Sequence, residues 1–375
     1  MPLERKFPVY KPALGGRERE YVLDCLDTTW ISSRGGYIDR FEREFSKFLQ
    51  VRSATTVANG TVALHLALHA LGIGPEDEVI VPALTYIASV NAIAYVGAKP
   101  VFVDSLEDTW NVDPEDVARK ITPRTKAVMI VHLYGNPCAM PELQNLCEER
   151  DLFLVEDAAE AFGSKYGGAF VGGFGDFSTF SFFGNKTITT GEGGMVASNN
   201  LELVERAAYL KNQGVSTTRE YWHDEVAFNF RMTNVCAAIG LAQLEQAEEI
   251  LQKKRAINGW YVKYLQGLDI VFQHEEEQAS SSYWMVTVLL PSQALRDFLR
   301  ESLASSGVET RPVFYPAHRM PAFASNASFP VAERLSERGM SLPSYPHLCE
   351  EEVEFICGLI RTVMDKKDTS FLSNA

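Results

Sequence analysis

The chain has 375 residues, of which 46% are hydrophobic and 22% charged, a composition typical of a globular protein. This length exceeds what one small core requires and predicts two or three domains. The formal charge of −14 disfavours nucleic acids and anionic membranes as partners. It still allows an anionic small ligand, because loops and helix N-termini can hold phosphates locally.

The sequence gives no sign of a membrane span or of a disulfide framework. No run of 18 apolar residues occurs, and no apolar run follows the charged residues of the N-terminus. The six cysteines are scattered, with no C-x-x-C pair, which is typical of reduced, buried thiols. These features predict a cytoplasmic protein.

Helical and strand-like patterns alternate over the first two-thirds of the chain. Helices are predicted at 37–49, 62–71, 142–150 and 201–211, and short apolar strands at 54–58, 78–81, 100–103, 127–131 and 152–155. Short, continuously apolar strands separated by helices indicate a largely parallel sheet that is covered on both faces. The expected fold class is therefore α/β.

The pattern changes in the last third of the chain. Residues 233–258 have one long helical periodicity that predicts a single helix joining two domains. A strand over 284–290 and helices over 293–304 and 350–365 then indicate a smaller α+β domain. We expect a large α/β domain over residues 1–250 and a small one over 251–375.

Lys186 is the first candidate for a chemical role. It follows the aromatic, strand-like stretch at Ser181-Phe182-Phe183 and precedes the glycine-rich loop 191–194. Burial near aromatic rings disfavours the charged form of a lysine, which lowers its pKa and makes the amine a usable nucleophile. The alternative is a surface lysine in a loop, and these residues alone leave both interpretations open.

Acidic residues follow the apolar run 152–155, at the edge of the sheet where open α/β proteins bind ligands. A carboxylate at Asp157 can pair with a protonated ring nitrogen and make a pyridoxal ring a better electron acceptor. Asp157 is also a good residue for capping the following segment. Glu160 can reach the same ligand or face solvent.

A second group of residues is suited to binding phosphate. Asn59, Gly60 and Thr61 lie between a predicted strand and a predicted helix, so a helix N-terminus, a close backbone approach and a hydroxyl coincide there. Ser181 offers a further hydroxyl. The alternatives are helix capping by Asn59 or Thr61 and a serine at a strand edge.

Two later segments carry further polar candidates. Asn229 and Arg231 precede the long helix, where they can hold phosphate or a carboxylate. Tyr315 and His318 lie in a loop stiffened by two prolines, and stiff polar loops often line sites. Ordinary capping and a plain surface loop are the respective alternatives.

Several other classes of site lack their motifs. The sequence has no P-loop, no G-x-G-x-x-G, no H-E-x-x-H and no G-x-S-x-G. His65 and His69 are four residues apart on a helix that is predicted to be buried, so packing is expected rather than metal binding. A nicotinamide-linked dehydrogenase is disfavoured on the same grounds.

Taken together, four segments resemble the sugar-nucleotide aminotransferases of the DegT/DnrJ/EryC1/StrS family. They are 59–61, 156–160, 181–194 and 229–232, and the resemblance extends from about residue 9 to about residue 365. It implies the aspartate aminotransferase-like fold, that is, pyridoxal phosphate-dependent transferase fold type I. Such a fold has a large, mostly parallel seven-stranded sheet and a smaller α+β C-terminal domain.

The resemblance also implies pyridoxal 5′-phosphate as cofactor, with Lys186 as its covalent partner and as the acid and base of the reaction. Asp157 would pair with the ring nitrogen, Glu160 would lie near the ring hydroxyl or the substrate, and Tyr86 would stack on the ring. Asn59, Gly60, Thr61 and Ser181 would hold the phosphate, with Asn229 reaching it from a second subunit. Family members that dehydrate rather than transaminate have histidine in place of the lysine, so Lys186 favours amino transfer.

The implied partners are small molecules and a second copy of the chain. Segments 25–33, 179–194 and 311–318 favour members that transfer an amino group from L-glutamate to a GDP-linked 4-keto-6-deoxy sugar for polysaccharide biosynthesis. Substrate contacts are expected from Trp30, Ser32, Arg231, Tyr315 and His318. A homodimer or a dimer of dimers with shared active sites is expected. A dTDP- or UDP-linked sugar, or a non-catalytic regulator that binds the cofactor, are the alternatives.

Overall fold

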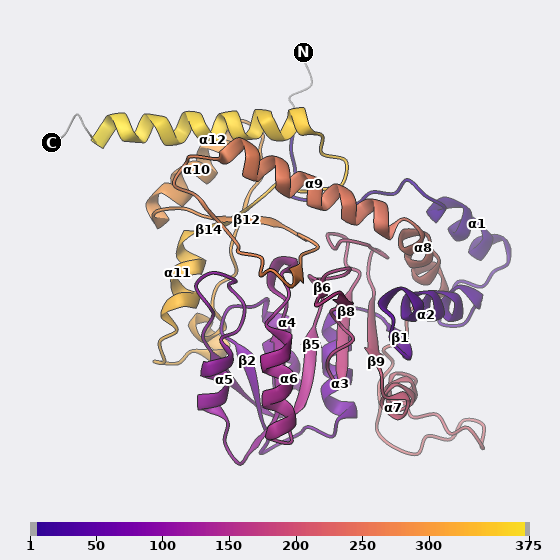
Figure 1. The fold of residues 1–375 in the computed structure, drawn as a ribbon. Coiled ribbons are helices and arrows are strands. Elements are labelled where there is room, and N and C mark those ends of the chain that lie inside the picture. The colour runs from indigo at the N-terminus through magenta and orange to yellow at the C-terminus, as the bar shows by residue number, and fades with distance from the viewer. Residues whose placement is uncertain (1–5, 372–375) are drawn as a thin grey trace.

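The structure, a computed structural model, describes residues 6–371. Its centre is a seven-stranded sheet in the order β1-β9-β8-β5-β4-β2-β3 (Figure 1). Strand β9 runs antiparallel to both of its neighbours, and every other adjacent pair is parallel. The strands are β1 (Ser53–Val57), β2 (Glu78–Pro82), β3 (Lys99–Val103), β4 (Thr125–Val131), β5 (Phe153–Asp157), β8 (Phe177–Ser181) and β9 (Gly194–Ser198). The predicted mostly parallel sheet is confirmed.

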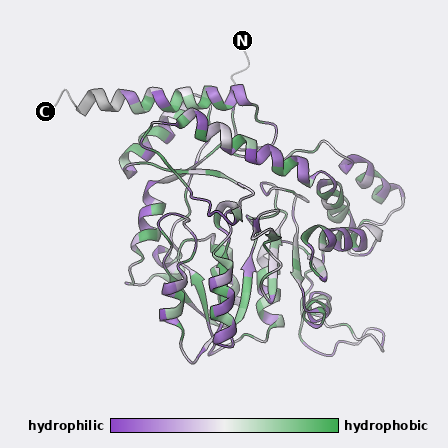
Figure 2. Ribbon diagram, viewed as in Figure 1, coloured by the Kyte–Doolittle hydropathy of each residue, from purple (hydrophilic) through white to green (hydrophobic). Residues whose placement is uncertain are grey.

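Helices cover both faces of this sheet, and the alternation of side chains along each strand assigns residues to the two faces. Val79, Val81 and Val155 pack against α3 and α4 on one face, while Ile80 and Leu154 pack against α5 and α6 on the other. The helices of this part are α1 (Glu18–Asp27), α2 (Gly36–Leu49), α3 (Gly60–Ala70), α4 (Ile87–Tyr95), α5 (Pro114–Lys120), α6 (Met140–Glu149) and α7 (Leu201–Lys211). Figure 2 shows the corresponding pattern, with hydrophobic strands enclosed by helices whose outer sides are hydrophilic.

The predicted long helix over 233–258 is wrong in one respect, because two helices occupy this stretch. Helix α8 (Asn234–Glu245) ends at Gln246, whose backbone (φ −107°, ψ 5°) is not helical, and α9 (Ala247–Leu265) starts immediately after it. No glycine or proline marks the break, so periodicity alone continues across it. Figure 1 shows the change of direction between α8 and α9.

The C-terminal part is built on a four-stranded antiparallel sheet in the order β10-β12-β14-β13. Its strands are β10 (Val271–Phe272), β12 (Val286–Leu289), β13 (Arg311–Pro312) and β14 (Gly339–Leu342), and its helices are α10 (Gln293–Ser305), α11 (Pro330–Arg338) and α12 (Glu350–Phe371). Three short strands, β6 (Lys165–Tyr166), β7 (Ala169–Phe170) and β11 (Ala279–Ser280), form a separate small sheet. Short 3₁₀ turns occur at Leu133–Gly135, Ala317–Arg319 and Pro321–Phe323.

The start of the described chain packs on the C-terminal part. Phe7 bridges to Val308 and shares a core with Ile257 and Val286. The N-terminal segment therefore crosses the expected boundary near residue 250 and ties the two parts of the chain together. None of the helices between residues 6 and 371 is long and apolar enough to cross a lipid bilayer.

Candidate active site

A cavity of about 690 Å³ lies at the carboxyl ends of the parallel strands. Asp157 ends β5, Ser181 ends β8 and Asn59 follows β1, so the sheet itself delivers these side chains to one place. Ligand sites of open α/β sheets occupy this edge. The predicted site residues that line the cavity are Asn59, Gly60, Thr61, Tyr86, Asp157, Glu160, Ser181 and Lys186.

The side chain of Lys186 is 13% exposed and ends inside this cavity. Its Nζ lies 3.8 Å from the centroid of the Trp284 ring and 3.9 Å from Oε1 of Glu160. Burial lowers the pKa of Lys186, and the carboxylates of Glu160 and Asp157 partly oppose this change. A lysine amine with a lowered pKa in a cavity is a competent nucleophile and base.

Asp157 is buried and held from two sides. Ser89 on α4 donates its hydroxyl to Oδ2 at 2.7 Å, and the amide of Ala159 donates to Oδ1 at 3.1 Å. Burial raises the pKa of Asp157, while these hydrogen bonds and the charge of Lys186 favour the carboxylate. A carboxylate fixed in this way presents a defined acceptor to a protonated ring nitrogen.

Glu160 is a second buried carboxyl group in the cavity wall. Its Oε2 accepts a hydrogen bond of 2.8 Å from the amide of Tyr134, which leaves Oε1 directed toward Lys186. Burial raises the pKa of Glu160 to about 7 although Lys186 acts in the opposite direction. A carboxyl group that titrates near neutral pH can accept and return a proton during a reaction.

The opposite end of the cavity is the N-terminus of α3. Asn59 caps the helix by accepting the amide of Val62 at 3.0 Å, so the capping alternative holds for this residue while it also lines the cavity. A Cβ at Gly60 would lie 2.7 Å from Cβ of Ser181. Glycine is therefore required for the close approach of the two segments that offer amides and a hydroxyl to an anion.

Aromatic side chains that the sequence analysis did not assign to the site form much of the remaining wall. Tyr134 stacks on Phe314 with ring centroids 5.3 Å apart and lies nearly parallel to Trp284 at 6.2 Å. Tyr86, which was predicted as a site residue, is 57% exposed, and its ring centroid lies 5.7 Å from that of Phe314. Tyr134 follows the end of β4, and this position could have identified it as a site residue from the sequence. Trp284 and Phe314 belong to the C-terminal part, and no local pattern connects them with the site.

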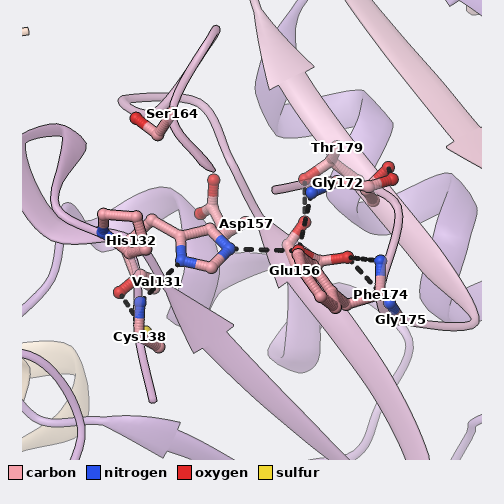
Figure 3. A network of polar contacts seen from close by, with 12 residues as sticks. Val131, His132, Cys138, Glu156, Asp157, Ser164, Gly172, Phe174, Gly175 and Thr179 are labelled. Atoms are coloured by element: carbon pink, nitrogen blue, oxygen red, sulfur yellow. Dashed lines mark hydrogen bonds and ion pairs between the residues drawn. The ribbon is translucent and has the colours of Figure 1, made fainter. Parts of the chain in front are cut away.

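Behind Asp157, a buried network fixes the end of β5 (Figure 3). Oε1 of Glu156 accepts the amides of Phe174 and Gly175 at 2.8 and 2.7 Å, and Oε2 accepts that of Gly172 at 2.7 Å. The ring of His132 links Glu156 to the chain beyond β4, with Nε2 3.2 Å from Oε2.

The tautomer of His132 follows from its other ring nitrogen. Nδ1 of His132 accepts the amide of Cys138 at 3.0 Å, so Nε2 carries the hydrogen that faces Glu156. Every oxygen lone pair of this buried carboxylate therefore has a donor nearby, which offsets the cost of burying its charge.

Six predicted site residues do not line the cavity in the described chain. They are Trp30, Ser32, Asn229, Arg231, Tyr315 and His318. His318 is buried, with Nε2 3.0 Å from Glu333 and its ring against Phe329. Tyr315 is 62% exposed, and Arg231 donates to the side-chain oxygen of Asn229. Trp30 borders a separate, smaller depression beside Arg34.

The residues of the cavity fit pyridoxal phosphate. The buried amine of Lys186 and the carboxylate of Asp157 belong to one wall, while the free amides of a helix N-terminus and the hydroxyl of Ser181 lie where the phosphate would bind. A side chain at residue 60 would collide with Ser181, so this end of the cavity can keep its shape only with glycine there. Asp157 would hold the ring nitrogen, Lys186 the aldehyde carbon, and the helix N-terminus together with Ser181 the phosphate.

Comparison with known proteins supports the assignment of this cavity as an aminotransferase active site. Residues 12–361 match the model of the DegT/DnrJ/EryC1/StrS aminotransferase family. The chain belongs to this family. It is 55% identical to GDP-perosamine synthase of Escherichia coli O157:H7 over 361 residues, which span 96% of this chain and 99% of that protein. It is 52% identical to GDP-perosamine synthase of Vibrio cholerae, over 94% of this chain and 98% of that protein.

Solved structures of aminotransferases have the same fold. The aminotransferase TlmJ from Streptoalloteichus hindustanus superimposes with a TM-score of 0.92 at 32% identity, over 96% of this chain and all of that one. The sugar aminotransferase Spr1654 from Streptococcus pneumoniae gives a TM-score of 0.93 at 30% identity, over 99% of this chain and all of that one. The aminotransferase fold of this family member is thereby confirmed.

Proposed function

We propose that this protein is a pyridoxal phosphate-dependent aminotransferase that moves an amino group from L-glutamate to C4 of GDP-4-keto-6-deoxy-D-mannose. The product is GDP-perosamine, a precursor for O-antigen or a related polysaccharide. The observation that carries the proposal is the grouping of Lys186, Asp157 and Glu160 in one buried cavity. The high identity to two GDP-perosamine synthases supports the choice of sugar nucleotide.

Bound pyridoxal phosphate supplies an electron-accepting ring that stabilises negative charge at the carbon undergoing proton transfer. The carboxylate of Asp157 would keep a proton on the ring nitrogen. The amine of Lys186, with its lowered pKa, would remove the proton from Cα of L-glutamate and deliver it to the former aldehyde carbon of the cofactor. Oε1 of Glu160 lies 3.9 Å from Nζ of Lys186, close enough to exchange a proton with the amine, and the pKa of about 7 suits Glu160 to that role.

The partner molecules are also part of the proposal. Arg311 lines the cavity and offers a guanidinium to a carboxylate or phosphate of a substrate. Trp30, Ser32, Asn229, Arg231, Tyr315 and His318 lie outside the cavity of the single chain. For Asn229 we propose that a second copy of the chain brings it to the phosphate, in a homodimer with shared active sites.

The direct test is turnover by the purified protein. With L-glutamate and GDP-4-keto-6-deoxymannose, we expect a GDP-linked amino sugar by mass spectrometry and 2-oxoglutarate in equal amount. Lys186→Ala should form neither, although it still folds. Turnover by Lys186→Ala would refute the proposed mechanism. A higher kcat/KM with a dTDP- or UDP-linked keto sugar would refute the choice of nucleotide alone.

A further inference from the structure

A second buried lysine contacts Trp284 of the cavity wall and has no role in the reaction described above. Lys254 on α9 is completely buried, and no carboxylate among the described side chains pairs with it. Its ammonium group donates instead to the carbonyl of Trp284 at 2.9 Å, to the hydroxyl of Ser344 at 3.2 Å and to the carbonyl of Ser344. Its Nζ also lies 5.3 Å from the centroid of the Tyr10 ring.

Burying a lone ammonium group costs several kcal/mol, and an apolar side chain of similar size would avoid this cost. Burial lowers the pKa of Lys254 to about 7, and this shift reflects the same free-energy cost of burying the charge. Three N–H donors face three oxygens, so the geometry is specific for an amine. A buried ammonium group bound to a residue of the cavity wall is therefore a candidate for a role in that site.

The contacts of Lys254 lead directly to Lys186. Trp284, whose carbonyl Lys254 holds, donates its ring N–H to the carbonyl of Asn185 at 2.6 Å and places its ring under Nζ of Lys186. Tyr10, whose ring lies over Lys254, donates its hydroxyl to the carbonyl of Lys186 at 2.5 Å. Lys254 thus binds the backbone of Trp284 and lies beside the ring of Tyr10, the two residues whose side chains donate to the carbonyls of Asn185 and Lys186.

We propose that Lys254 is a positioning residue for the reaction. It fixes Trp284 and Tyr10 relative to α9, and these two side chains fix the direction in which the Lys186 amine points. The inference rests on the proposed function for the role of Lys186. It adds a residue, far from Lys186 in the sequence, that sets the geometry of proton transfer without touching the substrate or cofactor.

The test compares Lys254→Met with Lys253→Met. Lys253 is the neighbouring residue on the same helix, its side chain is 44% exposed, and within residues 6–371 its salt bridge is to Glu249 across one helical turn. We expect Lys254→Met to lower kcat roughly tenfold to a hundredfold, because small misplacements of a reacting group are costly. Its KM values should stay within about twofold. Its melting temperature should fall only modestly, because the loss of a donor for three buried oxygens is partly offset by removal of a buried charge. Lys253→Met should match the wild type in all three.

A second measurement is independent of the loaded enzyme. In cofactor-free protein, hydrogen exchange of the peptide covering residues 182–190 should be faster in Lys254→Met and unchanged in Lys253→Met. Trp284→Phe, which removes the hydrogen bond to Asn185, should reproduce the loss of kcat. The double variant should be no slower than Trp284→Phe alone, because both changes interrupt the same path.

The outcomes separate this inference from the proposed function. An inactive wild-type protein would refute the function. An active wild type with Lys254→Met equal to Lys253→Met would refute the inference alone. Loss of kcat in proportion to lost stability, with additive effects in the double variant, would also refute it. Should Lys254→Met fail to fold, Lys254→Gln, which keeps two N–H donors without the charge, is judged by the same criteria.

Discussion

Nζ of Lys186 lies 3.9 Å from Oε1 of Glu160, and the two groups change each other's pKa in opposite directions. Burial lowers the pKa of the lysine and raises that of the carboxyl group, so both move toward neutral pH. Burial thus brings the pKa values of the two groups closer together, which lowers the free-energy cost of passing a proton between them. This pair therefore gives the cavity two neighbouring groups that can exchange a proton.

Glu160→Gln should slow the enzyme and stabilise the fold. The raised pKa of Glu160 means that its stability contribution is fully present below about 4.5, its ordinary value, and is lost as the pH rises through about 7. The amide has no charge to bury, so the variant should be more stable than the wild type at pH 8 by roughly 1–3 kcal/mol. The difference should vanish at pH 4.

Urea unfolding of cofactor-free protein at the two pH values measures this difference. The kcat of Glu160→Gln should fall about a hundredfold, the usual effect of losing a proton-transfer group. Equal stability of the two proteins at pH 8 would contradict the raised pKa. An unchanged kcat would contradict the role in proton transfer.

Asp157→Asn should keep the hydrogen bond from Ser89 but lose the negative charge. Without a carboxylate, the ring nitrogen of the cofactor loses its proton, and the rate of the glutamate half-reaction should fall on the order of a hundredfold or more. Stopped-flow absorbance of the cofactor follows this step. Ser89→Ala, which removes a single hydrogen bond to the carboxylate, should have a much smaller effect. A fast Asp157→Asn variant would exclude the proposed role.

Gly60→Ala should weaken cofactor binding. The new Cβ would lie 2.7 Å from Cβ of Ser181, so the two segments at the phosphate end must separate. We expect the Kd for pyridoxal phosphate to rise about tenfold or more, equivalent to about 1.4 kcal/mol. Gly259→Ala is the matched control, because no atom lies within 4 Å of its added Cβ on α9. That control should bind normally and gain up to about 1 kcal/mol of stability.

Glu156→Gln should destabilise the protein. In the variant an NH₂ group replaces one of the two carboxylate oxygens, and it would face backbone N–H donors whichever oxygen it replaces. The variant also loses the negative charge that four hydrogen-bond donors now satisfy. We expect the free energy of unfolding to fall by about 2–4 kcal/mol in chemical denaturation. Exposed Glu149→Gln should change it by less than about 0.5 kcal/mol. A neutral Glu156→Gln would show that the network carries little stability.

The sequence was sufficient for features that depend on local patterns. Apolar runs predicted β2, β4 and β5, and strand ends pointed to Asp157, because periodicity and position in a strand are local properties. Trp284 and Lys254 were not predicted as site residues. They reach the neighbourhood of Lys186 through long-range packing, about 100 and 70 residues further along the chain, which no local spacing encodes.

The break between α8 and α9 escaped prediction for a related reason. Gln246 has no intrinsic preference for ending a helix, and its side chain donates to Glu18 near the start of the chain. A tertiary contact thus accompanies a change of direction that helix propensity alone would not place there.

The two neighbouring acids of β5 point to opposite faces of the sheet, Asp157 into the cavity and Glu156 into its buried network. A slip of one residue in this strand would exchange them. The chemistry is thus tied to strand register as firmly as to residue identity. Attempts to change the sugar preference should therefore leave the length of β5 and its loops intact and alter the rim of the cavity instead.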